Sequence, residues 1–295
     1  SDVDAAIEDL LKQGFIVQVS LSEPALYGFR HALIRETIYK ALLRAPRQGY
    51  HGRIFAAVHG NRHSAPWIGT AALAEHAENA GLIAEAIECL VTAGGENASR
   101  SAMTEARQLL EHALGLCRDI DDKSRRESLM LKTMAVLGPV LTTSEGPGSE
   151  PAQRLYEDGI EIARRRPQAE RATWFPIYWG WWFTGSDVNG ERAHALLDEM
   201  KDVDNAEVQL QSRHCVWAID FYLGRHGICV SSVDEALPLY EGHPELRNPS
   251  HYGGHDTKVC GLAHRGLSLW FKGRTAEAIA SLRQAKDWAG QTGHV

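Results

Sequence analysis

A short pattern of apolar residues recurs at nearly constant spacing through two-thirds of the chain, and this recurrence restricts the folds that the chain can adopt. Each copy has an alanine, two further residues and then a pair of apolar positions. The alanines are Ala106, Ala152, Ala193, Ala236 and Ala278, separated by 46, 41, 43 and 42 residues. The last copy is imperfect, because Ser281 occupies its first apolar position. A period of this length is typical of proteins built from stacked, similar structural units.

Each unit is predicted to be a helix–turn–helix of roughly 43 residues. The second helix of the first copy carries apolar residues three and four apart, which form one stripe: Ala102, Ala106, Leu109, Leu110, Ala113 and Leu114. A single unit cannot bury this stripe alone, so neighbouring units must stack on it. Three copies are preceded by an aromatic residue with a glycine two positions later, which predicts a left-handed helix end at Gly185, Gly224 and Gly273.

The fold class expected for residues 46–295 is therefore all-α, a tetratricopeptide-like right-handed α–α superhelix. The usual tetratricopeptide step is 34 residues, so the helices or connectors here must be longer. The alternative is an irregular all-helical domain in which the alanine–leucine spacing arises by chance. The helix pairs are expected near 83–99/102–117, 124–141/151–165, 168–183/187–201, 205–223/227–241 and 256–272/274–291. Segments 142–149 and 243–250, which contain Gly, Pro and Ser, are expected to be surface loops.

Residues 1–45 follow another pattern and are assigned to a separate module. A helix from Val3 to Lys12 ends at Gly14, and two strand-like runs follow at 15–19 and 26–31. A second helix is predicted at 32–43, and helices near 48–62 and 69–80 lead into the array. Helix, β-hairpin and helix are the pattern of the end of a winged-helix module. The first helix is acidic, which favours a structural adaptor over a DNA-binding element.

Composition and charge exclude several classes of protein. The chain has 295 residues and a formal net charge of −7, which argues against a nucleic-acid binder because phosphates require a basic face. No apolar run approaches the ~20 residues that cross a bilayer, and no leader segment is visible at the start. Five cysteines without a paired pattern favour a reducing cytoplasm. Because the sequence begins inside a predicted helix, we expect a piece of a larger protein.

Two segments resemble known signalling proteins. Residues 29–39, Phe-Arg-His-Ala-Leu-Ile-Arg-Glu-Thr-Ile-Tyr, resemble the winged-helix exit of bacterial STAND-type (AAA-type) signalling ATPases. Residues 252–256, with Val259 and Cys260 and then 267–273, are similar to the repeat region of multidomain class III adenylate/guanylate cyclase-like proteins. The resemblance implies nucleotide-binding and output domains upstream, because this chain has neither a phosphate-binding loop nor a cyclase aspartate pair.

Four residues near the last repeat form a run of metal-ligand types: His251, His255, Cys260 and His264. Zinc takes four nitrogen or sulfur ligands, and Cys260 and His264 lie four apart on one face of a predicted helix. The simpler interpretation is that Cys260 packs in the core while the histidines form hydrogen bonds at the start of the helix. The expectation from the sequence is therefore no metal and no cofactor, with this run as the weak candidate.

Half of the eight tryptophans lie within nine positions of one predicted helix, at 174–182. Trp174, Tyr178 and Trp182 follow the spacing of a buried stripe, whereas Trp179 falls off it. These four residues are the candidate lining of a groove that grips a peptide or small effector, since tryptophan is a favoured anchor. The alternative is ordinary contact between repeats.

No catalytic motif is present, so the expected function is non-catalytic: a regulatory or sensor fragment of a multidomain signalling ATPase or adenylate cyclase-like protein. It would bind a protein segment or effector on its concave face and bias the upstream domains of the same chain. The alternative is a scaffold that assembles subunits, for which a homodimer is the expected partner arrangement. Neither nucleic acid nor a membrane is expected as a partner.

Overall fold

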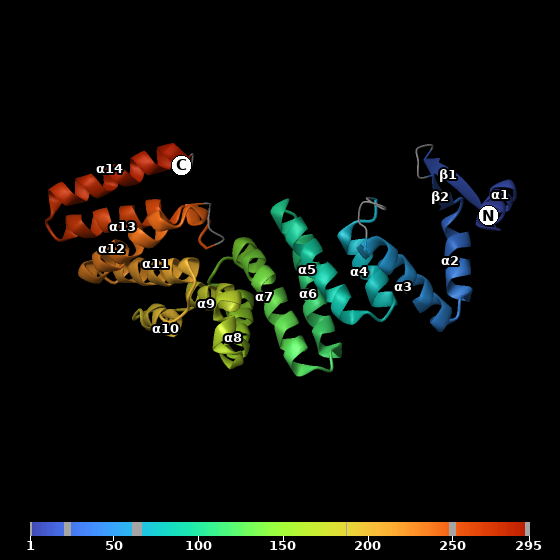
Figure 1. Cartoon of the computed structure of the whole chain (residues 1–295), viewed down its shortest axis with the longest axis horizontal. Coiled ribbons are helices and arrows are strands. Elements are labelled where there is room, and N and C mark those ends of the chain that lie inside the picture. Colours follow the sequence, from blue (N-terminus) through green and yellow to red (C-terminus); the bar gives the residue numbers. More distant parts are fainter. Residues whose placement is uncertain (1, 21–24, 61–66, 187, 248–251, 293–295) are drawn as a thin grey trace. The chain divides into compact units, whose positions relative to one another are not determined.

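The computed structural model describes residues 2–20, 25–60, 67–186, 188–247 and 252–292 and is almost entirely helical (Figure 1). Its contacts divide the chain into two compact units, Ser1–Cys89 and Leu90–Val295, which are described separately below. This division by contacts falls inside one helix. The module boundary expected between residues 45 and 46 is a different kind of division and stays a prediction.

The first unit contains the expected helix, hairpin and helix. Helix α1 spans Asp2–Lys12, strands β1 and β2 span Ile16–Ser20 and Leu26–Phe29, and α2 spans Ala32–Ala41. The strands are antiparallel, with Ile16 opposite Phe29, and an irregularity in register lies between Gln18 and Ser20. Two packed helices follow, α3 (Arg44–Gly60) and α4 (Thr70–Asn79). The hairpin is present, but its assignment to a winged helix stays a prediction.

The second unit consists of helix pairs in the predicted order, beginning with α5, most of which lies in it. The pairs are α5 (Ile83–Ser99) and α6 (Met103–Leu116), α7 (Lys123–Glu145) and α8 (Glu150–Arg165), α9 (Arg171–Thr184) and α10 (Glu191–Met200), α11 (Ala206–Tyr222) and α12 (His226–Gly242), and α13 (Thr257–Phe271) and α14 (Thr275–Thr292). Short 3-10 turns lie at Cys117–Asp119, Gln168–Glu170 and Pro244–Arg247.

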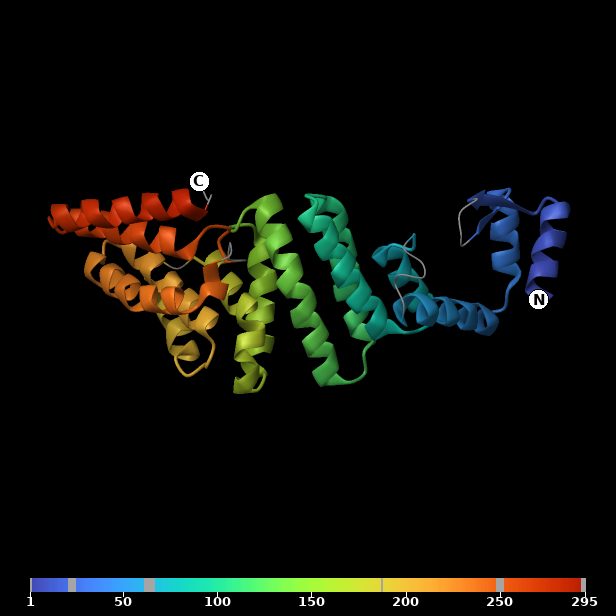
Figure 2. The ribbon, with the colours of Figure 1, turned by 45° about the horizontal axis from the view of Figure 1, so that its top comes forward.

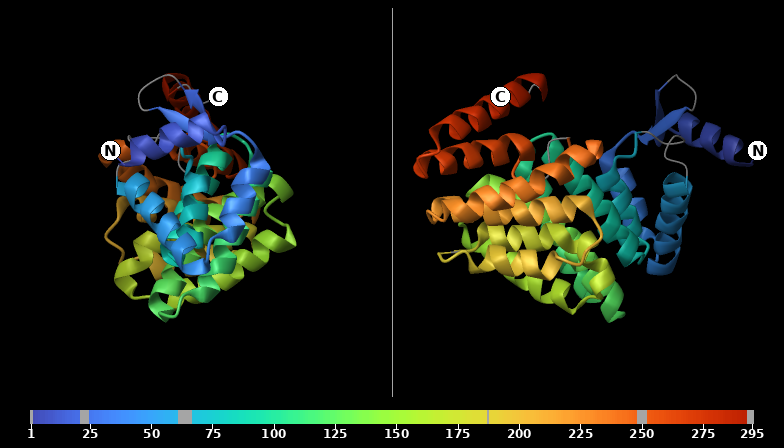
Figure 3. Two further views of the ribbon diagram at one scale, coloured as in Figure 1. Left: turned by 90° about the vertical axis from the view of Figure 1, so that its right-hand side faces the viewer. Right: turned by 60° about the vertical axis from the view of Figure 1, so that its left-hand side comes forward.

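The stacking within this unit is that of a helical solenoid. Each helix from α6 to α14 packs on the next, and the first helices of successive pairs also contact one another, as α7 with α9, α9 with α11 and α11 with α13. Figure 2 shows α11 to α14, in orange and red, as adjacent layers, and the right-hand view of Figure 3 shows the same order. The predicted tetratricopeptide-like α–α superhelix is therefore confirmed as the fold class.

The repeated alanines lie where the periodicity requires. Ala106, Ala152, Ala193, Ala236 and Ala278 are each at most 1% exposed, and they lie in α6, α8, α10, α12 and α14. An alanine at this position lets two helix backbones approach closely. The hydroxyl of Ser281, at the imperfect place, is buried and donates to the carbonyl of Leu262 at 2.8 Å. A polar residue is accepted there because this bond satisfies it.

One close approach depends on glycine. The buried Tyr156 of α8 lies against Gly138 of α7 and Gly180 of α9. A Cβ atom on Gly138 would lie 2.1 Å from the Tyr156 hydroxyl oxygen, and one on Gly180 would lie 1.9 Å from a ring carbon. Both distances are far below van der Waals contact, so these glycines create the slot for the ring.

Two local predictions were wrong. Residues 142–145 are the last turn of α7 rather than a loop. Gly185 is not left-handed, with φ at −81°, although Gly224 and Gly273 are, at 72° and 73°. Glycine is needed at position 185 for space and not for its backbone conformation. A Cβ atom there would lie 2.2 Å from the guanidinium of Arg192, which donates to the carbonyl of Trp181 at 2.9 Å.

Candidate functional site

The aromatic residues of α9 divide into a buried set and a partly exposed set. Phe175 and Tyr178 are 0% and 1% exposed and belong to the core. Trp181 is also buried, with the guanidinium groups of Arg164 and Arg192 each 4.6 Å from its ring centre. Tyr178 therefore cannot line a groove, and this part of the prediction is corrected: the stripe spacing of Tyr178 places it between helices.

The partly exposed set forms a continuous aromatic surface. We use this name for Trp179, Trp182 and Phe183, which lie beside the buried Tyr252. The Trp179 ring stacks on Phe183 with centres 4.7 Å apart, and lies 5.7 Å from both Trp182 and Tyr252. Phe183 is 40% exposed, while both tryptophans are half-buried. Trp179 is thus not enclosed by repeat helices.

Polar contacts distinguish the tryptophans of α9. Trp174 is half-buried and its indole nitrogen donates to Glu170 at 2.9 Å, which lowers the pKa of that carboxyl group. Its ring is not among those that contact the aromatic surface in the described residues. The indole nitrogen of Trp179 is buried and has no hydrogen-bond partner among the described residues. Because this nitrogen is covered, a partner would contact the apolar part of the Trp179 ring.

The metal-ligand run is rearranged in the structure. His255 and Cys260 come together, and His214 of α11 joins them, with their ligand atoms all within 4.8 Å of one another. We call these three residues the His/Cys cluster. His264 lies beside the cluster, with its Nδ1 2.9 Å from the Cys260 carbonyl oxygen and 3.4 Å from its Sγ. His251 lies outside the described residues.

Burial shifts the pKa of two members of the cluster toward the uncharged form. It lowers the pKa of His214 to about 3, with smaller contributions from His255 and His264, and it raises the pKa of the Cys260 thiol to about 11. A neutral imidazole keeps one nitrogen free as a lone-pair donor. The cysteine is a thiol at neutral pH in the absence of a cation.

A polar pocket of about 290 Å³ lies between α10 and α11, lined by His194, Leu197, Asp198, Lys201, Gln209 and Arg213. His194 pairs with the buried Asp220 at 3.0 Å, an arrangement that orients a general base in some enzymes. Lys201 carries the one amine among the lining residues. Its hydrogen bond to Asp198 raises its pKa, so the amine stays protonated and cannot attack.

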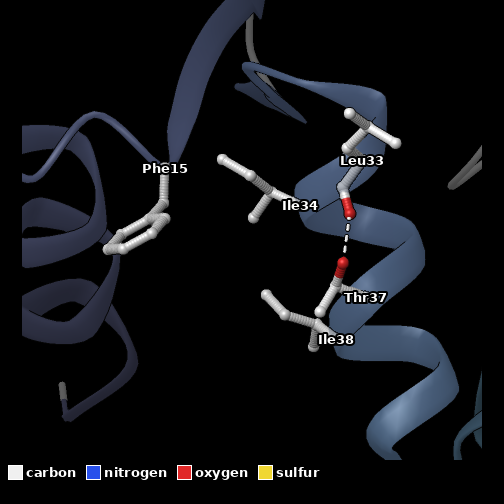
Figure 4. A pocket seen from close by; sticks show the side chains of 5 residues that line it. All are labelled: Phe15, Leu33, Ile34, Thr37 and Ile38. Atoms are coloured by element: carbon white, nitrogen blue, oxygen red, sulfur yellow. Dashed lines mark hydrogen bonds between the residues drawn. The ribbon is translucent and has the colours of Figure 1, made fainter.

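An apolar pocket of about 340 Å³ lies in the first unit (Figure 4). Ile34 and Ile38 of α2 point toward the side on which Phe15 lies, at the start of the hairpin, and Leu33 and Thr37 complete the lining. This side of α2 is open: Leu33 is 75% exposed and Ile38 is 47% exposed. Among residues 2–12 and 32–41 no residue is buried. Within the described part of the chain, this face has no cover.

Among the described residues, no helix has both the length and the apolar character needed to cross a membrane.

Comparison with known proteins gives one close relative by sequence. An uncharacterized protein of Rhizobium meliloti (strain 1021) is 48% identical over 291 residues, which is 98% of this chain. The chain spans 28% of the length of that relative. No protein-family model matches.

Solved structures with a similar fold are much more distant in sequence. BtubC (BKLC) from P. vanneervenii has a TM-score of 0.54 at 13% identity over 86% of this chain and 94% of its own. The tetratricopeptide-like repeats of a Podosopora anserina kinesin light chain score 0.53 at 13% identity over 71% of this chain and 97% of theirs. A STAND protein with a tetratricopeptide repeat sensor from Pyrococcus horikoshii scores 0.49 at 13% identity, covering 97% of this chain and 46% of its own. The first two likenesses place the fold of this chain among tetratricopeptide-like repeat folds.

Proposed function

We propose that this chain is a non-catalytic recognition module that binds an apolar segment of a protein, or an effector of similar chemistry, on its aromatic surface. Stacked helix pairs hold their side chains in a preformed array, so binding requires little ordering of the module. We further propose that it is the sensor part of a multidomain signalling ATPase or adenylate cyclase-like protein. Binding would then bias the other domains through different affinities for their two states.

The observation that carries the proposal is the aromatic surface. Trp179, Trp182 and Phe183 offer apolar area to solvent. An apolar anchor in the partner would cover the rings. Tryptophan residues are typical energetic centres of protein interfaces.

The multidomain context has independent support. The Rhizobium meliloti relative is far longer than the region that it shares with this chain. The open apolar face of α2 would suit a contact with another domain of such a protein. We also propose a reducing cytoplasm, because the five cysteines are scattered through the sequence without a paired pattern. The two pockets contain no complete set of catalytic groups, which favours recognition over turnover.

A peptide-display selection tests the proposal. The immobilised chain is expected to enrich short peptides that carry an aromatic or large aliphatic anchor. The chosen peptides should bind the Trp182→Ala and Phe183→Ala variants at least tenfold more weakly, because less than a third of interface positions dominate affinity and these are the central ones. Trp270→Ala is the matched control, since Trp270 is 56% exposed on α13 and lies outside the aromatic surface.

Equal loss of affinity in Trp270→Ala, or no selection of apolar anchors, would contradict the proposal.

The second candidate function is subunit assembly, in which the aromatic surface contacts a second copy. Light scattering separates the two: a monomer over a wide concentration range favours peptide recognition, whereas a dimer that dissociates in Phe183→Ala favours assembly.

A further inference from the structure

The His/Cys cluster joins a helix to a loop and a second helix that lie about 40 residues further along the chain. His214 comes from α11, His255 from the loop before α13, and Cys260 from the first turns of α13. Their ligand atoms lie within 4.8 Å of one another. The cluster plays no part in the function proposed above, so its arrangement needs a separate explanation.

A hydrogen-bond chain fixes the orientation of His214. Its Nδ1–H donates to the side-chain oxygen of Gln211 at 3.0 Å, and the amide nitrogen of Gln211 donates to the hydroxyl of Thr257 at 3.0 Å. The Nε2 atom of His214 is then the lone-pair nitrogen, and it faces the Cys260 sulfur at 3.5 Å. Ligating histidines usually hold their second nitrogen in this way, by donating to an oxygen.

The same arrangement occurs at His255. Its Nδ1–H donates to the Gly253 carbonyl oxygen at 2.8 Å, so Nε2 carries the lone pair. That Nε2 atom is buried and has no hydrogen-bond partner among the described residues. A purely structural polar cluster would satisfy such an atom, because an unpaired buried polar group destabilises the fold by about 1–3 kcal/mol.

Gly253 makes room for this histidine. It has φ at 86°, and a Cβ atom there would lie 2.6 Å from the imidazole Cε1. Any other residue would displace the ring and strain the backbone. The loop is thus shaped to hold His255 against α11 and α13.

The observed spacing fits a tetrahedral metal ion. With Zn–N near 2.1 Å and Zn–S near 2.3 Å, tetrahedral angles give a nitrogen–sulfur separation of about 3.5 Å. The distance from His214 Nε2 to Cys260 Sγ has this value. The other ligand-atom separations are within 4.8 Å, so binding would draw His255 toward the other two residues. His264, which donates to the carbonyl of Cys260, is placed to support the sulfur and not to ligate.

We propose that His214, His255 and Cys260 form a zinc site, with the two Nε2 atoms and the Cys260 sulfur as ligands and a fourth position left to water or an exogenous ligand. Two imidazoles and one thiolate are a donor set that zinc accepts, and the thiol would release its proton on binding. Zinc would tie the loop to α11 and α13. Since Tyr252 of that loop contacts Trp179, it would also hold one edge of the aromatic surface.

The test is metal titration of the reduced, metal-free chain. Zinc, measured against a chromophoric chelator, is expected to bind with one equivalent per chain. Cobalt, as a spectroscopic substitute, is expected to give a thiolate charge-transfer band and the intense visible bands of a tetrahedral ion. Cys260→Ala should abolish the charge-transfer band, and His255→Ala should weaken zinc binding by more than 100-fold. Gln211→Ala should weaken it by about 10–100-fold, as typical for a residue that orients a ligand.

Matched variants show whether a loss of zinc binding is specific to the three proposed ligands. Cys117→Ala removes another buried thiol, and His243→Ala removes an exposed histidine; both should bind zinc like the unmodified chain. Circular dichroism of His255→Ala checks that the fold is kept. Less than a tenth of an equivalent of zinc, or unchanged binding in both Cys260→Ala and His255→Ala, overturns the proposal. Because metal binding is read without any peptide, its outcome does not depend on the recognition function.

Discussion

The apolar helix faces of the repeat unit are buried, whereas those of the first two helices of the first unit, α1 and α2, are open. In the repeat unit, each helix buries its apolar stripe on neighbours one helix or one pair away: α8 alone buries seven of its residues. In the first unit, α1 and α2 bury none over residues 2–12 and 32–41, although their apolar residues are as regularly spaced. The difference shows that amphipathic spacing predicts a helix and a face, but the neighbours decide whether the face is covered.

The most direct test of this difference is to truncate one leucine in each unit and compare the losses of stability. Leu110 of α6 is 0% exposed and lies against Gly94, whereas Leu33 of α2 is 75% exposed. Leu110→Ala is expected to lower the free energy of unfolding by about 2–5 kcal/mol, because it leaves a cavity. Leu33→Ala should change it by less than about 0.5 kcal/mol. Urea unfolding followed by tryptophan fluorescence measures the first effect, since every tryptophan except Trp67 lies in the repeat unit.

Unfolding of the first unit, followed by hydrogen exchange in α3 and α4, measures the effect of Leu33→Ala. A loss of several kcal/mol there would mean that the face of α2 is covered after all. Equal, small effects of both substitutions would contradict the distinction between the units.

The second test concerns how closely the repeat helices approach. Gly180→Ala places a methyl group into the ring of the buried Tyr156, and overpacking of this kind lowers stability by about 1–3 kcal/mol. Gly115→Ala is the matched control, because Gly115 is an exposed residue of α6 with nothing within 4 Å of the added atom. It should raise stability by about 0.5–1 kcal/mol through helix propensity. Thermal and urea unfolding of both variants check the opposite signs.

A double variant sharpens this test. Tyr156→Phe removes the hydroxyl that approaches Gly138, so it should relieve part of the strain in Gly138→Ala but little of that in Gly180→Ala, which meets ring carbons. Additive effects in both combinations would show that the slot is not tight.

The sequence alone predicts the repeat unit well, because its signal is local and periodic. A 3.6-residue period and a constant step locate the helix pairs and the five buried alanines without knowledge of the fold. The same reasoning placed His255 and Cys260 together, since they are close in the chain. It missed His214, which lies 46 residues before Cys260. One repeat step is the signal that could have found it, because residues one step apart lie on adjacent helices, as Gln211 and Thr257 also do.

The sequence was less informative about surfaces. Trp179 and Tyr178 are adjacent and both aromatic, yet one is half-buried and the other is in the core. Helical spacing gives the direction of each side chain, but the width of the buried face depends on how neighbouring helices cross. Tyr252, the buried ring beside Trp179, lies about 70 residues further along the chain, beyond one repeat step, so no local pattern joins the two.

The smallest effect that we expect is a pH dependence of the stability of the first unit. His51 of α3 and His76 of α4 share a hydrogen bond between their Nδ1 atoms at 2.8 Å, and Tyr39 contacts the other nitrogen of His51 at 2.9 Å. Burial, and then the charge of His51, lower the pKa of His76 below 6.5. The unfolded chain therefore binds more protons than the folded chain as pH falls below 6.5, so stability is lost from there down through the lowered pKa.

Hydrogen exchange in α3 and α4 at pH 7.5 and pH 5.5, corrected for the intrinsic rate, measures this loss. His76→Gln is expected to flatten the dependence because the glutamine side chain does not titrate, whereas His31→Gln, which changes an exposed histidine of the same unit, should leave it unchanged. The reverse sign, with greater stability at pH 5.5, would mean that the folded unit favours a charged His76. The two rings would then have to be further apart than the hydrogen bond between them allows.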